Sequence, residues 1–119
     1  MGYGALASHE RVVLDVAALE AEVNNGGLHQ FFFNSDGDRV APVIDALRII
    51  GAPHAAEIVE EACRLFPDGG PSADRGVRQD QLEQLDDDSF ESLDERFYSY
   101  PDPIGELLEA YWKKNSLPA

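Results

Sequence analysis

The chain has 119 residues, which suits one domain, and a domain of this length buries well over half of its unfolded surface without a metal or a disulfide. Its 23 acidic and 9 basic residues give a formal net charge of -14, which argues against direct binding to nucleic acid or to an anionic membrane. A single cysteine excludes an internal disulfide, and the lack of a long apolar run or a secretion signal predicts a soluble, cytoplasmic protein.

The first third of the chain predicts two helices separated by glycines. From Ser8 onward, apolar residues recur at steps of three and four, as they do on one face of a helix. Residues 24–27 end this helix, because two glycines supply the left-handed backbone that a helix end needs. A short helix over residues 27–33 follows. Its three phenylalanines, 31–33, cannot all face one side, so at least one is expected at a second contact such as another subunit.

The middle of the chain predicts two more helices. Asp38 is expected to cap a helix that contains residues 40–50, and Pro42 fits only in the first turn of that helix. Pro53 opens the next helix, which continues to Phe66.

The C-terminal half begins with a Gly/Pro/Ser-rich connection over residues 67–74. Apolar spacing then predicts helices over residues 77–85, 90–97 and 104–112, with Ser89 as a candidate N-cap. No segment alternates with a period of two. The whole chain therefore predicts a single compact all-α domain of six or seven short helices.

The polar turn after Phe33 raises the question of a metal site. It carries oxygen ligands at the first, third, fifth and twelfth positions of an EF-hand-like numbering: Asn34, Asp36, Asp38 and Asp45. The sixth position should be glycine but is Arg39, and Pro42 interrupts the loop. The segment is therefore interpreted as a turn whose side chains cap neighbouring backbone, and neither a metal nor a cofactor is predicted.

Catalytic motifs are not found, and no catalytic residue is predicted. The three histidines are isolated in sequence, and no nucleophile stands beside an obvious base. One alternative is an acid–base pair of Glu22 and His29, which together with Asn34 would make residues 22–38 the site of a small hydrolase or ligand-binding protein. Cys63 is interpreted as a small buried hydrophobe.

A structural interpretation of the same segment is favoured. A helix broken at Gly26 and Gly27 leaves backbone N–H and C=O groups unpaired. The side-chain amides of Asn24, Gln30 and Asn34 are expected to satisfy them, because an amide both donates and accepts hydrogen bonds.

These residues also resemble the signature Asn-x-Gly-Gly-x-x-Gln-Phe-Phe-x-Asn of the DMP19-like family. The matching positions, with an acidic residue before them and a glycine after them, are Glu22, Asn24, Gly26, Gly27, Gln30, Phe31, Phe32, Asn34 and Gly37. The likeness continues through residues 47–51, 82–85 and 93–98, and so covers nearly the whole chain. It implies a compact helical domain with a fold-maintaining signature. The member that names the family is a dimeric DNA mimic that occupies the DNA-binding face of a transcription factor, so a homodimer is implied as well.

The acidic residues are concentrated in one segment, since residues 80–109 hold eleven acids and a single base, Arg96. On a continuous helix, carboxylates four residues apart lie ~5–6 Å apart at Cβ, close to the spacing of adjacent phosphates. A turn at residues 86–88 would interrupt such a row. The predicted partner-binding residues are Asp80, Glu83, Asp86, Asp87, Asp88, Glu91, Asp94 and Glu95.

The leading hypothesis is a non-enzymatic, acidic interaction protein that mimics DNA and binds a basic DNA-binding protein. An alternative partner is a toxin, which an immunity-type protein of the same charge would neutralise. The remaining alternatives are the small-molecule site over residues 22–38 and a domain whose charge serves only solubility.

Overall fold

The computed structural model describes residues 8–86 and 88–116, and this part of the chain contains helices and no strand. The elements are α1 (Ser8–Phe33), η2 (Ser35–Arg39, a 3₁₀ helix), α2 (Val40–Ile49), α3 (Pro53–Arg64), α4 (Arg75–Glu83), α5 (Glu91–Tyr98) and α6 (Ile104–Ser116). The predicted all-α fold is confirmed. None of these helices combines the length and the apolarity that a membrane span requires.

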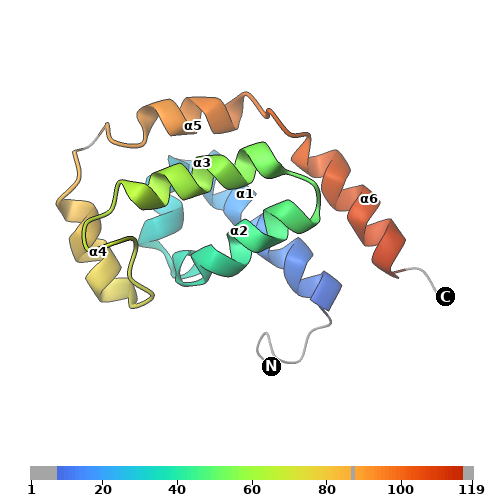
Figure 1. The fold of residues 1–119 in the computed structure, drawn as a ribbon, viewed down its shortest axis with the longest axis horizontal. Coiled ribbons are helices and arrows are strands. Elements are labelled where there is room, and N and C mark those ends of the chain that lie inside the picture. The colour runs from blue at the N-terminus through green and yellow to red at the C-terminus, as the bar shows by residue number, and fades with distance from the viewer. Residues whose placement is uncertain (1–7, 87, 117–119) are drawn as a thin grey trace.

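The helix α1 is the element on which most of the others pack. It contacts η2, α2, α4, α5 and α6, whereas α3 lies between α2 and α5. Figure 1 shows α4 at one end of the molecule and α6 at the other, with α5 running alongside α3. The C-terminal half of the chain therefore wraps around the N-terminal half.

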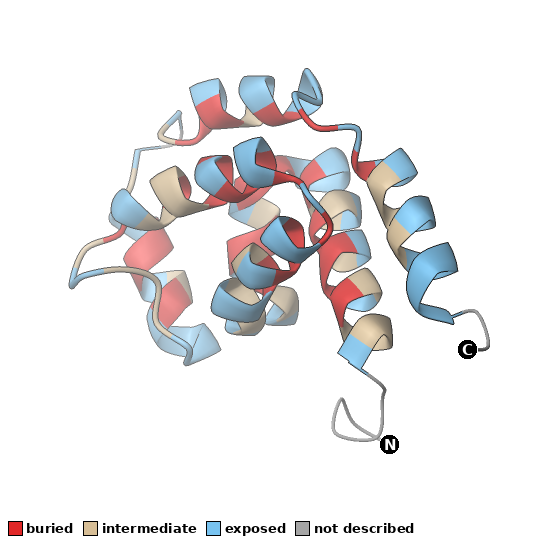
Figure 2. Ribbon diagram, turned by 45° about the vertical axis from the view of Figure 1, so that its right-hand side comes forward, coloured by how far each residue is buried: buried red, intermediate tan, exposed pale blue. Residues whose placement is uncertain are grey.

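The core is formed by the inward faces of these helices, as the buried segments in Figure 2 show. On α1 the predicted apolar row is buried throughout: Val12, Val16, Leu19 and Val23. Phe32 then lies edge-on to Phe66, with ring centres 4.8 Å apart, and is stacked on Phe90 at 5.7 Å. This aromatic cluster joins the end of α1 to the end of α3 and the start of α5.

Two predicted helix caps are wrong. The residue before α2 is Arg39, which makes no side-chain cap, because Asp38 lies inside η2 and its carboxylate is bound by Arg78 instead. The residue before α5 is Phe90, so Ser89 does not cap that helix. A side-chain cap is formed by Asp74, which accepts a hydrogen bond from the Val77 N–H at the start of α4.

The connection between α5 and α6 is fastened to the start of α3 by Asp102. One carboxylate oxygen accepts from the Ala55 N–H at 2.9 Å, and the other lies 2.9 Å from Nδ1 of His54. The hydrogen bond to Asp102 raises the pKa of His54. Burial opposes ionisation of Asp102, but the bonds from Ala55 and His54 outweigh it and lower the pKa of that carboxyl.

These shifts predict where the pair stabilises the fold. A histidine whose folded-state pKa is raised above 6.5 adds to the free energy of unfolding, and this stabilisation is fully present below pH 6.5. The stabilisation is lost as the pH rises through the folded-state pKa. A carboxyl whose folded-state pKa lies below 3.8 contributes above that pH. The pair should therefore stabilise most between these two values. His54→Ala should lower the melting temperature more at about pH 5 than at about pH 9.

Melting curves of both proteins across this range provide the test. The same substitution in an Asp102→Asn background is the control, and there the loss in melting temperature should depend on pH much less, because Glu57 is then the remaining carboxylate that raises the pKa of His54. If His54→Ala lowered the melting temperature equally at both pH values in the native background, the stabilising pair of His54 and Asp102 would be contradicted.

Candidate functional site

The predicted break at the two glycines is present inside α1. Gly26 and Gly27 have non-helical backbone angles, with φ of 75° at Gly27, so α1 is two helical segments joined by a kink. A side chain at Gly27 would be doubly excluded, because this φ is left-handed and a Cβ would lie 2.6 Å from Oδ2 of Asp94. The glycine therefore allows α5 to approach the kink.

Asp94 takes part in this kink. The break interrupts the helical hydrogen-bond ladder, and the orphaned Leu28 N–H donates to Oδ1 of Asp94 at 2.8 Å. Desolvation raises the pKa of Asp94, although the Leu28 bond and the nearby His29 oppose this shift. Asp94 was predicted to bind a partner, but the structure places its carboxylate against the backbone of α1.

A network of side-chain amides spans the same kink. The Glu22 carboxylate accepts from Asn34 Nδ2 at 2.7 Å and from Gln30 Nε2 at 3.5 Å. Asn25 donates to the side-chain oxygen Oε1 of Gln30 at 3.2 Å. Asn24 donates to the Tyr100 hydroxyl at 2.8 Å. The network ties the segment before the kink to the segment after it.

The expectation that these amides satisfy the exposed backbone groups is wrong. The side chains that do so come from α5: Asp94 accepts from the Leu28 N–H, and the Tyr98 hydroxyl donates to the Val23 carbonyl at 2.7 Å. The amides pair with side chains instead. Their hydrogen-bonding groups are used within the fold, which supports the structural interpretation of the signature.

The alternative pair of Glu22 and His29 is not brought together as an acid–base site. Glu22 is bound by the two amides, whereas His29 is exposed and stacks on Phe33 with ring centres 6.0 Å apart. Phe31 and Phe32 are fully buried and Phe33 is 46% exposed, so one of the three phenylalanines does face outward. A contact of Phe33 with another subunit remains a prediction.

Two of the four oxygen ligands considered for a metal site in the turn after Phe33 make internal contacts. Asn34 binds Glu22, and Asp38 is bound by Arg78. Within residues 8–86 and 88–116, no group of three or more His, Cys, Asp or Glu side chains is arranged to hold a metal ion.

Arg78 is the residue of this region that sequence reasoning missed. Its side chain comes from α4, is fully buried, and donates to the Phe32 carbonyl at 2.5 Å and the Asn34 carbonyl at 3.0 Å. It also donates to Asp38 at 2.6 Å and to the Ser72 carbonyl at 2.9 Å. A guanidinium suits this position because the last carbonyls of a helix lack internal partners and carry partial negative charge.

Gly37 makes room for this arginine. A Cβ at Gly37 would lie 2.8 Å from the Phe31 carbonyl oxygen and 3.0 Å from Nε of Arg78. The glycine that follows the Asn-Gly-Gly signature therefore leaves the space that the Arg78 side chain occupies. The signal in the sequence is weak: an arginine can bind the carbonyls at the end of a helix, but Arg78 lies more than forty residues from Phe32.

The remaining predicted partner-binding residues lie on α4, on α5 and on the connection between them. We call six exposed residues the acidic surface: Asp80, Glu83, Asp86, Asp88, Glu91 and Glu95. Asp87 lies outside the described residues. Asp80 and Glu83 share α4, and Glu91 and Glu95 share α5. Because α4 ends at Glu83 and α5 begins at Glu91, the carboxylates do not form a continuous helical row.

The acidic surface is not neutralised by nearby bases. In the described part of the chain, five arginines and lysines form salt bridges, and the acids that they contact all lie elsewhere: Asp15, Asp38, Glu60, Glu61 and Glu109. Arg96, the one base on α5, is drawn to Glu61 of α3, which lowers the pKa of Glu61. Arg78, on α4, is buried.

Part of the acidic surface is concave. An open groove of about 470 Å³ lies between the kink of α1 and α5, with Asp88, Glu91 and Glu95 among its lining residues. His29 and Tyr98 supply aromatic rings to the same groove, and Asp94 lies in its wall. The groove offers several carboxylate oxygens to a cationic group that approaches from solvent.

The Arg78 site predicts a large effect on stability. Arg78→Met should lower the free energy of unfolding by about 3 kcal/mol or more, because it leaves buried carbonyls and Asp38 without their donor. The matched control is Arg75→Met, an exposed arginine three residues earlier on α4, which should change it by about 0.5 kcal/mol or less.

Urea unfolding followed by circular dichroism measures both variants. Similar small changes in the two would show that Arg78 is not the anchor of this end of α1.

Comparison with curated proteins and with solved structures gave no match. A family model described as DMP19-like protein matches residues 4–115, which is nearly the whole chain. The elements that this match covers include the kinked α1, the Arg78 site and the acidic surface. The chain therefore belongs to the DMP19-like family.

Proposed function

We propose that this protein is a non-enzymatic interaction protein that binds a basic, nucleic-acid-binding protein through the acidic surface. The observation that carries the proposal is a group of six exposed carboxylates that no arginine or lysine of the described residues neutralises. The net charge of -14 adds a long-range field that attracts a cationic partner.

The mechanism is competition with phosphate. Lysine and arginine side chains that otherwise neutralise a nucleic-acid backbone pair with the carboxylates of the acidic surface instead. Two helices and a connection carry these carboxylates, so the surface presents charge over a curved area rather than along one helical row. Binding should weaken steeply as salt screens the charges.

Membership of the DMP19-like family supports this proposal, because the member that names the family is a DNA mimic. The internal pairing of Glu22, Gln30 and Asn34 gives no comparable support for a hydrolase or a small-ligand site over residues 22–38. A toxin with a basic surface would be bound by the same chemistry, and identification of the partner decides between the two.

A charge-reversal variant tests the proposal. Glu83→Lys, Asp88→Lys and Glu95→Lys together change α4, the connection and α5 at exposed positions. The variant should bind the partner ~100-fold more weakly, because like charges then face each other across the interface. Its helix content should not change.

The matched control reverses three exposed acids elsewhere that form no salt bridge: Asp45, Glu57 and Glu106. Both variants have the same net charge. The measurement is capture from lysate at low salt, identification of the bound protein, and titration of that protein against a DNA competitor. Equal losses in the two variants, or no loss in either, would refute a specific acidic surface.

A further inference from the structure

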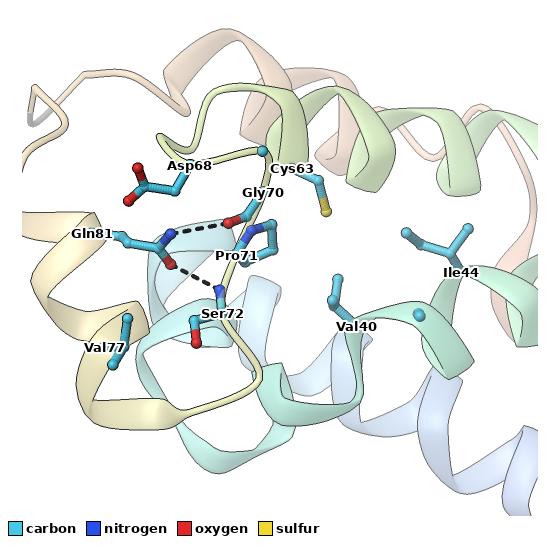
Figure 3. A pocket seen from close by; sticks show the side chains of 11 residues that line it. Val40, Ile44, Cys63, Asp68, Gly70, Pro71, Ser72, Val77 and Gln81 are labelled. Carbon is cyan, nitrogen blue, oxygen red and sulfur yellow. Dashed lines mark hydrogen bonds between the residues drawn. The ribbon is translucent and has the colours of Figure 1, made fainter.

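A second concave site lies beside the acidic surface and has a different chemistry. It is a pocket of about 570 Å³ between α2, the end of α3, the connection over residues 67–74 and α4. Figure 3 shows Val40 and Ile44 rising from α2 toward the Cys63 sulfur of α3, with the Pro71 ring beside them. Val77 of α4 completes the apolar lining.

One wall of this pocket is held in place by Gln81. This side chain is buried, and its amide nitrogen donates to the carbonyls of Pro67 at 3.2 Å and Gly70 at 3.0 Å. Its amide oxygen accepts from the Ser72 N–H at 2.8 Å, and Figure 3 shows two of these three bonds. Because the connection is fixed before anything binds, an occupant does not have to order it, which lowers the cost of binding.

The charges around the pocket define the occupant further. Among the described residues that line the pocket, Asp68 is the only charged one, and none is a lysine or an arginine. Val77, which is 50% exposed, lies between Asp74 and Asp80, three residues away on either side and therefore on the same side of α4. Arg75 lies two residues from Val77 and projects from another side of the helix.

Asp80 also belongs to the acidic surface, so the pocket and that surface are continuous along α4. Interfaces commonly combine one buried apolar anchor with charged groups around it, and the anchor provides much of the affinity. We propose that the pocket receives an apolar side chain of the basic partner, flanked in the partner's sequence by lysine or arginine. This inference rests on the proposed function and adds an anchor whose contribution to binding does not depend on salt.

Two synthetic peptides of equal charge test the anchor: acetyl-Lys-Arg-Phe-Arg-Lys-amide and the same peptide with serine in place of phenylalanine. The phenylalanine peptide should bind on the order of 10-fold more tightly, as expected when an aromatic side chain is buried. The ratio of the two affinities should persist as salt weakens both.

Cys63 provides a site-specific readout, because it is the only cysteine and lines the pocket. Burial raises the pKa of the Cys63 thiol to about 11, so alkylation by excess iodoacetamide is slow and its rate can be followed by mass spectrometry. The phenylalanine peptide should slow alkylation further, whereas the serine peptide should not.

The decisive variant is Val77→Asp. It adds negative charge beside the pocket, so a purely electrostatic site would bind both peptides at least as well as before. If the pocket is an anchor site, the Val77→Asp variant should instead bind the phenylalanine peptide no more tightly than the serine peptide. Leu14→Asp, at a 46% exposed position on α1, is the control and should keep that advantage.

The outcomes separate the two proposals. Equal affinities of the two peptides would overturn the anchor, and so would an advantage of the phenylalanine peptide that survives Val77→Asp. Phenethylamine, an aromatic amine without a peptide chain, is a further probe. If it bound as tightly as the phenylalanine peptide and slowed the alkylation of Cys63 equally, the pocket would be a small-molecule site and the anchor would be overturned. If the charge-reversal variant at Glu83, Asp88 and Glu95 weakens both peptides but preserves their ratio, the acidic surface and the anchor are both supported. If it weakens neither peptide, the proposed function fails even where the pocket discriminates between them.

Discussion

The fold depends on a single buried cation at the end of its longest helix. Arg78 donates to the Phe32 carbonyl in the last turn of α1 and to the Asn34 carbonyl just after the helix. It also binds Asp38 of η2 and the Ser72 carbonyl at the end of the connection. Since an unpaired guanidinium is costly to bury, these partners must assemble together around it. The position of α4, and with it one side of both the acidic surface and the neighbouring pocket, follows from this contact.

Four other bases pair with carboxylates outside the acidic surface, which contributes to the uneven distribution of charge on such an acidic chain. Arg39, Arg48, Arg96 and Lys113 each face a carboxylate that lies away from the acidic surface, and Arg78 is inside the protein. The repulsion between the six exposed carboxylates is therefore not relieved locally. Folded proteins tolerate such repulsion when the charges reach solvent, and a cationic partner would relieve it.

The sequence predicted the helices and the kink, whose signals lie in neighbouring residues, but it did not predict the helix caps at Asp38 and Ser89 correctly. Apolar spacing predicted the helices, and the adjacent glycines predicted the kink in α1, because both depend on neighbouring residues. The contacts of Arg78, Asp94 and Asp102 could not be predicted, since each joins segments more than forty residues apart. The same limit affected the site: acidic residues were recognised, but Asp94 faces Leu28, and the helix break between Glu83 and Glu91 sets where the others lie.

The kink in α1 also has a consequence for the order of events as the chain leaves the ribosome. Its free N–H at Leu28 is satisfied by Asp94, and the carbonyl of Phe32 by Arg78. Both partners are synthesised long after α1 itself, so until then water must solvate these groups. The two segments of α1 are meanwhile joined across the kink by the hydrogen bonds of Gln30 and Asn34 to Glu22, without the contacts from α4 and α5. The N-terminal helix thus acquires its final shape only when the second half of the protein has been made, and contacts of this sequence separation slow folding relative to a simple helical bundle.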